Sequence, residues 1–132
     1  MKFNRYLPIL SGIILAALCT ACQVYPNTIN INENDNHTEI TLEKGDLLIV
    51  TLAANPTTGY QWEYISAETP FLEQIGDAEY TPGTDLLGAS GVSVFTFNAK
   101  ETGHGNLHLI YHRTFEEGIA PIKELAVDLQ VK

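Results

Sequence analysis

The chain has 132 residues, of which 16 are acidic and 7 are Lys or Arg, and its formal net charge at pH 7 is −9. This acidic composition argues against nucleic acid as a partner, because phosphate binding requires a basic surface. The length suits one domain with a core of its own, and no repeat or change of composition marks a second domain.

The N-terminus has the pattern of a signal peptide. Lys2 and Arg5 precede an apolar run at residues 9–18, and small residues lead from there to Cys22. The run is shorter than the roughly 20 residues that a membrane-spanning helix needs. Removal of residues 1–21 on export would take away two basic side chains and no acid, which leaves a formal charge of −11. One cysteine would remain, so an intramolecular disulfide is excluded.

The predicted cleavage site, Leu-Cys-Thr-Ala-Cys at residues 18–22, resembles a bacterial lipobox, in which the last cysteine becomes the lipidated first residue. The lipobox pattern prefers an aliphatic residue in place of Cys19, and the alternative is ordinary cleavage after Ala21. Gln23 follows the cysteine and resembles a sorting signal for the outer membrane. The lipobox therefore implies an exported lipoprotein anchored through Cys22 at the bacterial outer membrane or periplasmic face. Ordinary cleavage implies a periplasmic or secreted protein.

Most of the mature chain shows the period of two that is typical of half-buried antiparallel strands. The asparagine-rich residues 22–36 are predicted to be a tether, and residues 37–132 are predicted to form one domain. Alternating segments occur at residues 39–42, 94–99 and 124–131. Residues 47–54 are apolar at both parities, which predicts a central strand covered on both faces. Turn signals occur at residues 44–46, 55–56, 82–83 and 103–105. The pattern predicts an all-β, immunoglobulin-like β-sandwich of seven or eight mainly antiparallel strands.

The sequence shows no arrangement of residues that predicts a catalytic or metal-binding site. His104, His108 and His112 are four residues apart, which would suit a metal site on a helix. Their segment alternates like a strand, where positions four apart lie about 13 Å from each other at roughly 3.3 Å per residue. We therefore expect exposed strand histidines. Cys22 lies at the processed terminus, and no phosphate loop or serine elbow is present. The sequence predicts no enzyme, no metal and no cofactor.

One segment, Asn-Pro-Thr-Thr-Gly-Tyr at residues 55–60, predicts a stiff loop. Pro56 fixes its own φ and favours an extended Asn55, and Gly59 permits a positive φ where the chain turns back. A preordered loop loses little conformational entropy on binding. The alternative is a simple turn, and Tyr60 and Trp62 are expected to be core aromatics.

Two further segments extend this pattern: Gly-Ala-Ser-Gly at residues 88–91, before an alternating strand, and Arg-Thr-Phe at residues 113–115. In order and spacing, over residues 38–131, the chain resembles the chagasin family of papain-type cysteine protease inhibitors. That family has Asn-Pro-Thr-Thr-Gly followed by Tyr or Phe in one loop, a Gly-Ala-x-Gly type loop, and Arg-Pro-Trp in a third. Thr114 and Phe115 depart from the third motif.

The resemblance implies a monomeric sandwich that inserts three loops into the substrate cleft of a papain-like cysteine protease and inhibits it reversibly. The first loop would cover the catalytic cysteine, and the other two would grip the walls of the cleft. The protease-binding residues so implied are Asn55, Pro56, Thr57, Thr58, Gly59, Tyr60, Gly88, Ala89, Ser90, Gly91, Arg113, Thr114 and Phe115. Arg113 could instead be a solvated strand end. A different class of function remains open: a surface-anchored adhesion or assembly module that shares the fold and inhibits nothing.

Overall fold

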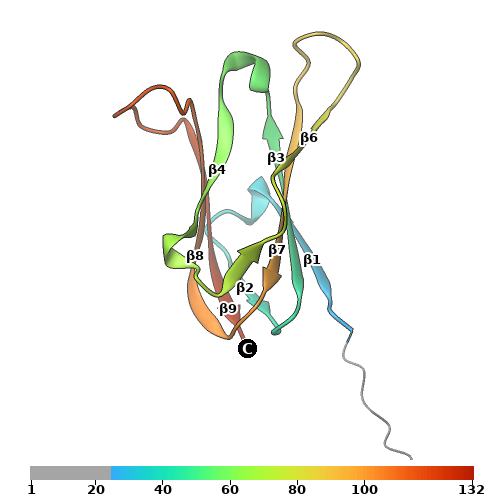
Figure 1. Ribbon diagram of the computed structural model, residues 1–132, viewed down its shortest axis with the longest axis vertical. Helices are drawn as coiled ribbons and strands as arrows, with labels where there is room; N and C mark the ends of the chain where they lie inside the picture. Colours follow the sequence, from blue (N-terminus) through green and yellow to red (C-terminus); the bar gives the residue numbers. More distant parts are fainter. Residues whose placement is uncertain (1–24) are drawn as a thin grey trace, which may run out of the picture.

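The computed structural model describes residues 25–132, which form two β-sheets packed face to face (Figure 1). The predicted signal peptide and Cys22 lie outside the described residues. The first sheet has the order β1 (Thr28–Asn32), β3 (Leu47–Ala54), β7 (Gly91–Ala99) and β5 (Leu72–Gln74), with β6 (Glu79–Pro82) also paired to β7. The second has the order β2 (Glu39–Leu42), β9 (Lys123–Val131), β8 (Gly103–His112) and β4 (Gln61–Ile65). Three single-turn 3-10 helices lie in the connections: η1 (Glu33–Asp35), η2 (Pro56–Thr58) and η3 (Ser66–Glu68).

The predicted β-sandwich is confirmed, with nine strands in the described chain in place of seven or eight. The pairings are mainly antiparallel, as predicted, and the exceptions are β1 with β3 and β2 with β9, which are parallel. The excess arises from short strands such as β5, whose three residues are too few to show a period of two. No helix in residues 25–132 is long and apolar enough to cross a membrane.

Residues 28–36 belong to the domain, so the predicted end of the tether at residue 36 lies too far along the chain. β1 pairs with β3 from Thr28 to Asn32, and Ile31 is buried in the core. The buried carboxylate of Asp46 accepts hydrogen bonds from the backbone amides of Asn27 (2.9 Å) and Glu43 (2.8 Å). These bonds fix the start of β1 against the turn between β2 and β3. The asparagine-rich composition had concealed a strand with only two apolar residues.

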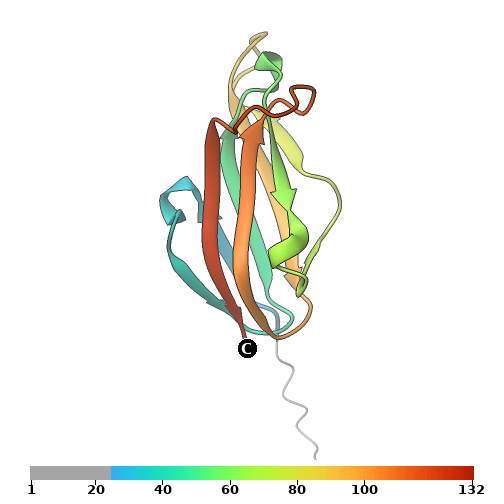
Figure 2. The same cartoon turned by 90° about the vertical axis from the view of Figure 1, so that its left-hand side faces the viewer.

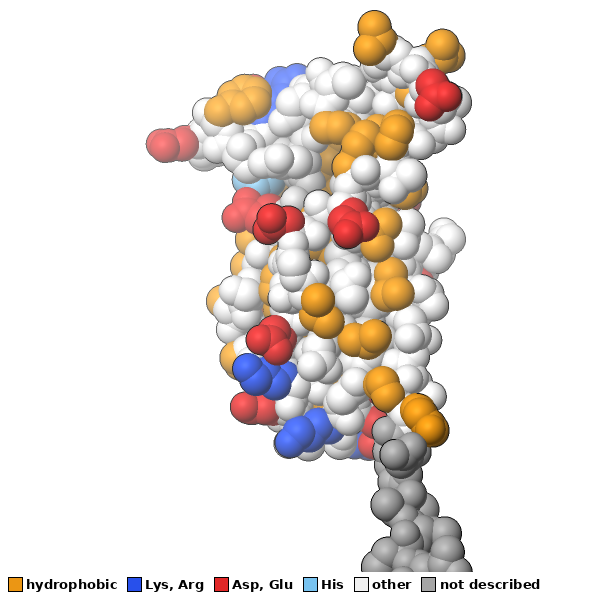
Figure 3. Space-filling view, turned by 45° about the vertical axis from the view of Figure 1, so that its right-hand side comes forward, with side chains coloured by type: hydrophobic (Ala, Val, Ile, Leu, Met, Phe, Trp, Pro, Cys, Tyr) orange, Lys and Arg blue, Asp and Glu red, His pale blue; other side chains and the backbone are white. Residues whose placement is uncertain are grey.

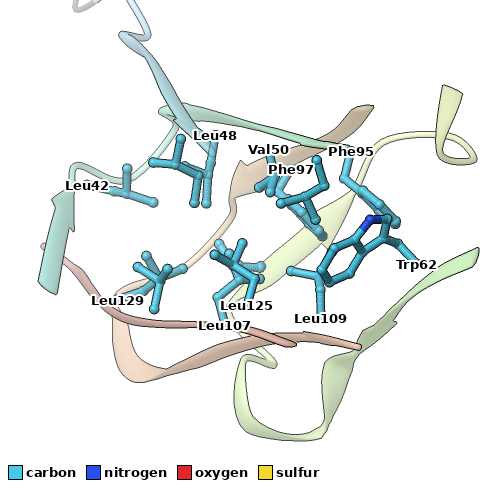
Figure 4. Packing of buried hydrophobic residues seen from close by; sticks show 14 of the residues in the cluster. Leu42, Leu48, Val50, Trp62, Phe95, Phe97, Leu107, Leu109, Leu125 and Leu129 are labelled. Carbon is cyan, nitrogen blue, oxygen red and sulfur yellow. The ribbon is translucent and has the colours of Figure 1, made fainter. Parts of the chain in front are cut away.

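The core lies between the two sheets, where inward residues of one sheet meet those of the other (Figure 4). Leu48, Val50 and Phe97 come from the first sheet, and Leu107 and Leu129 come from the second. The prediction that β3 is covered on both faces is wrong, because its residues alternate between buried and partly exposed. The outer face of this sheet therefore remains in contact with solvent despite its apolar side chains.

Two glycines that were predicted to mark a turn begin strand β8 instead. A Cβ on Gly105 would overlap the backbone carbonyl oxygen of Glu68, and one on Gly103 would press against the ring of Phe71. Their role is therefore to let the η3 segment approach the strand closely, and not to reverse the chain direction.

The three histidines lie on β8, as predicted. His104 is exposed, whereas His108 and His112 are half-buried and contact carboxylates of Glu124 (3.3 Å) and Glu63 (2.6 Å). Within residues 25–132, no group of three or more His, Cys, Asp or Glu side chains could hold a metal ion.

Candidate functional site

Three loops lie together at one end of the sandwich, opposite the C-terminus and the start of β1, in two perpendicular views (Figures 1 and 2). The first loop (residues 55–60) joins β3 to β4, the second (residues 83–90) joins β6 to β7, and the third (residues 113–122) joins β8 to β9. Every predicted binding residue in the described chain lies in these loops except Gly91, which begins β7. The fold thus gathers three segments that are far apart in sequence.

The first loop is closed by its own hydrogen bonds. Asn55 caps η2 through a side-chain oxygen that accepts from the Thr57 amide at 3.3 Å, and the Thr58 hydroxyl donates to the Asn55 carbonyl at 2.6 Å. The Gly59 amide donates to the carbonyl of Pro56 at 3.0 Å, and Gly59 has a φ of 81°. The predicted positive φ is confirmed, and these hydrogen bonds favour a single conformation of the loop.

Aromatic side chains tie the first loop to the core. The Tyr111 hydroxyl accepts from the Asn55 amide at 2.9 Å, and its ring lies 5.6 Å from that of Tyr60 and 5.0 Å from that of Trp62. The Trp62 indole donates to the Ala53 carbonyl at 2.9 Å. Trp62 is buried, as predicted for a core aromatic, whereas Tyr60 is only half-buried and packs against the core from the loop.

Arg113 connects the third loop to the first. Its Nε donates to the Thr58 carbonyl at 3.1 Å, its guanidinium carbon lies 4.4 Å from the centre of the Tyr60 ring, and Nη1 donates to Glu116 at 3.0 Å. Arg113 is therefore not a solvated strand end, which was the alternative left open by the sequence.

The two departures from the third motif also contact the first loop or its flank. A Cβ on Gly59 would lie 3.3 Å from Cε1 of Phe115, so the Phe115 ring packs against the glycine backbone. The Thr114 hydroxyl accepts from the Gln61 side chain at 3.3 Å. The first and third loops thus share one continuous contact.

A hydrogen bond links the second loop to the first: the Asn55 side-chain amide donates to the Gly88 carbonyl at 3.3 Å. The base of the second loop is narrow, because the Gly83 amide donates to the Ser90 carbonyl at 3.0 Å. The Tyr80 hydroxyl supports it from β6 by donating to the Ala89 carbonyl at 3.1 Å. A Cβ on Gly91 would overlap the backbone of β6, which explains the glycine at this position.

Apolar side chains are exposed mainly at this end. Eight large hydrophobic side chains are exposed in residues 25–132, and five of them belong to the second and third loops: Leu86, Leu87, Phe115, Ile119 and Ile122. Figure 3 shows hydrophobic side chains at the top of the loop end. Such a concentration is typical of surfaces that bind another macromolecule. Apart from Phe115, the sequence analysis missed these residues, although apolar side chains in glycine-rich segments outside any strand pattern could have indicated them.

A cavity of about 420 Å³ opens between the first and third loops. Its walls are mainly apolar and include Tyr60, Tyr111 and Ile122. Two cations, Arg113 and Lys123, also line it, and the Lys123 amine lies 5.5 Å from the centre of the Tyr111 ring. The loop end therefore combines small polar side chains, exposed apolar side chains and a few cations, which suits binding of a protein surface.

Known proteins resemble this chain in sequence and in fold. The family model for the chagasin family peptidase inhibitor I42 matches residues 41–129. Amoebiasin-1 of Entamoeba histolytica is 33% identical over 87 residues, which are 64% of this chain and 82% of the relative. A crystal structure of a cysteine protease inhibitor from Entamoeba histolytica has a TM-score of 0.69 at 19% identity, over 82% of this chain and 98% of that one. The structure of PbICP-C in complex with falcipain-2 has a TM-score of 0.53 at 14% identity, over 80% of this chain and 99% of that one.

Proposed function

This chain belongs to the chagasin family of peptidase inhibitors, and from that premise we propose that it inhibits papain-like cysteine proteases reversibly. The observation that carries the proposal is the placement of three motif-bearing loops at one end of the sandwich, among most of the exposed apolar side chains. A cysteine protease as partner is further supported by the relative that was solved with falcipain-2.

The first loop has the properties of a blocking element. Thr57, Thr58 and Gly59 present small side chains and backbone groups that fit a narrow cleft. A scissile peptide must be held in a near-attack geometry by the protease. Residues 56–58 are instead held in a helical turn by the loop's own hydrogen bonds. The loop would therefore occupy the cleft without being cleaved, and inhibition would be noncovalent.

The flanking loops supply the contacts on either side. Leu86 and Leu87 in the second loop are 77% and 104% exposed, and Phe115 in the third is 71% exposed. Apolar side chains held at loop tips bury area on binding with little loss of backbone freedom. These loops would then grip the two walls of the cleft, while the first loop covers the catalytic cysteine.

Titration of papain with the purified protein tests this proposal. We expect papain turnover to fall in proportion to added protein, to reach zero near a molar ratio of one, and to recover on dilution. Trypsin, which uses a serine nucleophile, should keep its activity and serves as the control. If papain and a cathepsin-like protease both keep full activity, the protein is not an inhibitor of this class. The adhesion or assembly module would then be favoured.

For localisation, we propose that the protein is exported and anchored through a lipid on Cys22. The support is the lipobox-like segment at residues 18–22, which follows a basic and apolar N-terminus. A membrane anchor would present the inhibitor at a surface while the domain itself remains in water.

A further inference from the structure

Arg113 binds two loops at once. The carbonyl of Thr58 and the ring of Tyr60 belong to the first loop, whereas Glu116 belongs to the third, and all three contact one guanidinium. The planar group suits this arrangement, because it can donate along its edge while an aromatic ring covers its face. We propose that Arg113 is a positioning residue that joins the first and third loops into one wedge.

The joint explains how the third loop can act despite its departure from Arg-Pro-Trp. Thr114 lacks the fixed φ of proline, so the order of this loop must come from contacts with the rest of the protein. Arg113 provides them, and it also places the Phe115 ring against Gly59. Without the joint, the two loops would move separately, and the fraction of molecules with a competent wedge would fall. Apparent affinity falls by the same factor as that fraction.

The same contacts argue against Arg113 as a direct anchor on the protease. Its side chain is only 34% exposed, Nε and Nη1 are already bonded, and one face is covered by Tyr60. A protease could reach only what remains of the edge. Arg113 therefore affects binding chiefly through the shape of the loops, and its effect on inhibition rests on the proposed function.

Two variants and one matched control test the joint. Arg113→Lys keeps the positive charge and removes the planar fork, and Glu116→Gln removes the carboxylate that holds Nη1. Glu117→Gln removes the same charge one residue later, where the side chain has no hydrogen bond or ion pair within residues 25–132. Each variant is measured in two ways. NMR of the free protein records NOEs between the Phe115 ring and the Gly59 α-protons, with backbone order parameters for residues 57–60. A papain assay gives the inhibition constant.

We expect Arg113→Lys to lose the NOEs and to lower the order parameters from about 0.85 towards about 0.6. Its inhibition of papain should weaken by about tenfold. Glu116→Gln should change both measurements in the same direction by a smaller amount, and Glu117→Gln should change neither.

Other outcomes overturn the proposal. If Arg113→Lys weakens inhibition while the NOEs and order parameters stay unchanged, Arg113 is a direct protease contact. If the NOEs disappear and inhibition stays the same, the joint does not position the wedge. If no measurement changes, the joint does not exist in solution. A failure of the unsubstituted protein to inhibit papain would refute the proposed function alone, and the NMR data would still decide whether Arg113 joins the loops.

Discussion

Two constraints disfavour a Cβ atom at position 59, where the chain has glycine. The φ of Gly59, 81°, is unfavourable for residues with a Cβ, and a Cβ would also lie 3.3 Å from the Phe115 ring. Gly45 shares the first constraint, with a φ of 97°, but a Cβ there would meet nothing within 4 Å. A comparison of the same substitution at Gly59 and at Gly45 therefore separates the cost of backbone strain from the loss of the contact between the first and third loops.

We predict that Gly59→Val and Gly45→Val each lower the free energy of unfolding by about 1–3 kcal/mol, the usual cost of a strained backbone. Inhibition of papain should weaken by at least about tenfold in Gly59→Val and stay unchanged in Gly45→Val. Urea unfolding and inhibition constants measure the two effects. A folded Gly59→Val protein with the parental inhibition constant would mean that the first loop is not the central contact.

At the scale of elements, the start of β1 is held in part by one buried side chain, that of Asp46. Asp46 accepts two backbone hydrogen bonds, from Asn27 before β1 and from Glu43 before the following turn. It joins the edge of the first sheet to the end of β2. A buried amide that loses its acceptor costs free energy, because water cannot readily replace the bond.

We predict that Asp46→Ala lowers the free energy of unfolding by about 2–4 kcal/mol, since two charge-assisted bonds are lost. Asp77→Ala is the matched control, because Asp77 is exposed and makes no side-chain hydrogen bond within the described chain. It should change stability by less than about 0.5 kcal/mol. Equal effects of the two substitutions in urea unfolding would show that β1 is not held in this way.

The elements also show what the sequence could and could not predict. A period of two identified β8 and β9, because long half-buried strands repeat the pattern several times. It missed β1 and β5, which are short. It overstated the burial of β3, because a run of apolar residues does not reveal that only one of its faces is fully buried. The turn predicted at residues 103–105 is wrong, because the glycines there are needed for the close approach of the η3 segment, which lies far away in sequence.

For the site, motif order indicated which segments meet, and the structure brings those segments to one end. The sequence could not predict that Arg113 points at Thr58 and Tyr60, because side-chain direction across two loops depends on the tertiary structure. It also gave no account of Leu86 and Leu87, whose exposure is known only once the core has been filled by other residues.

For the whole molecule, the lipid anchor can be tested by fractionation. We predict that Cys22→Ser moves the protein from the membrane fraction to the soluble fraction, because the acyl chains that hold it are lost. Two or more acyl chains are needed for stable attachment to the membrane. A Ser substitution at Cys19 is the control and should leave the protein with the membranes. Equal membrane recovery of Cys22→Ser and the unsubstituted protein would contradict the anchor.

The start of β1 at the end opposite the loops determines how far an anchored molecule could reach. Asn27 is bound to the domain, so the chain from Cys22 to Thr28 spans at most about 22 Å. β8 has ten residues and extends about 33 Å towards the loops. An upright molecule would hold its loops several nanometres above the lipid. It would intercept enzymes that diffuse in the surrounding fluid, and an active site lying close to the bilayer would be out of its range. The fold would then serve as a stalk as well as a scaffold.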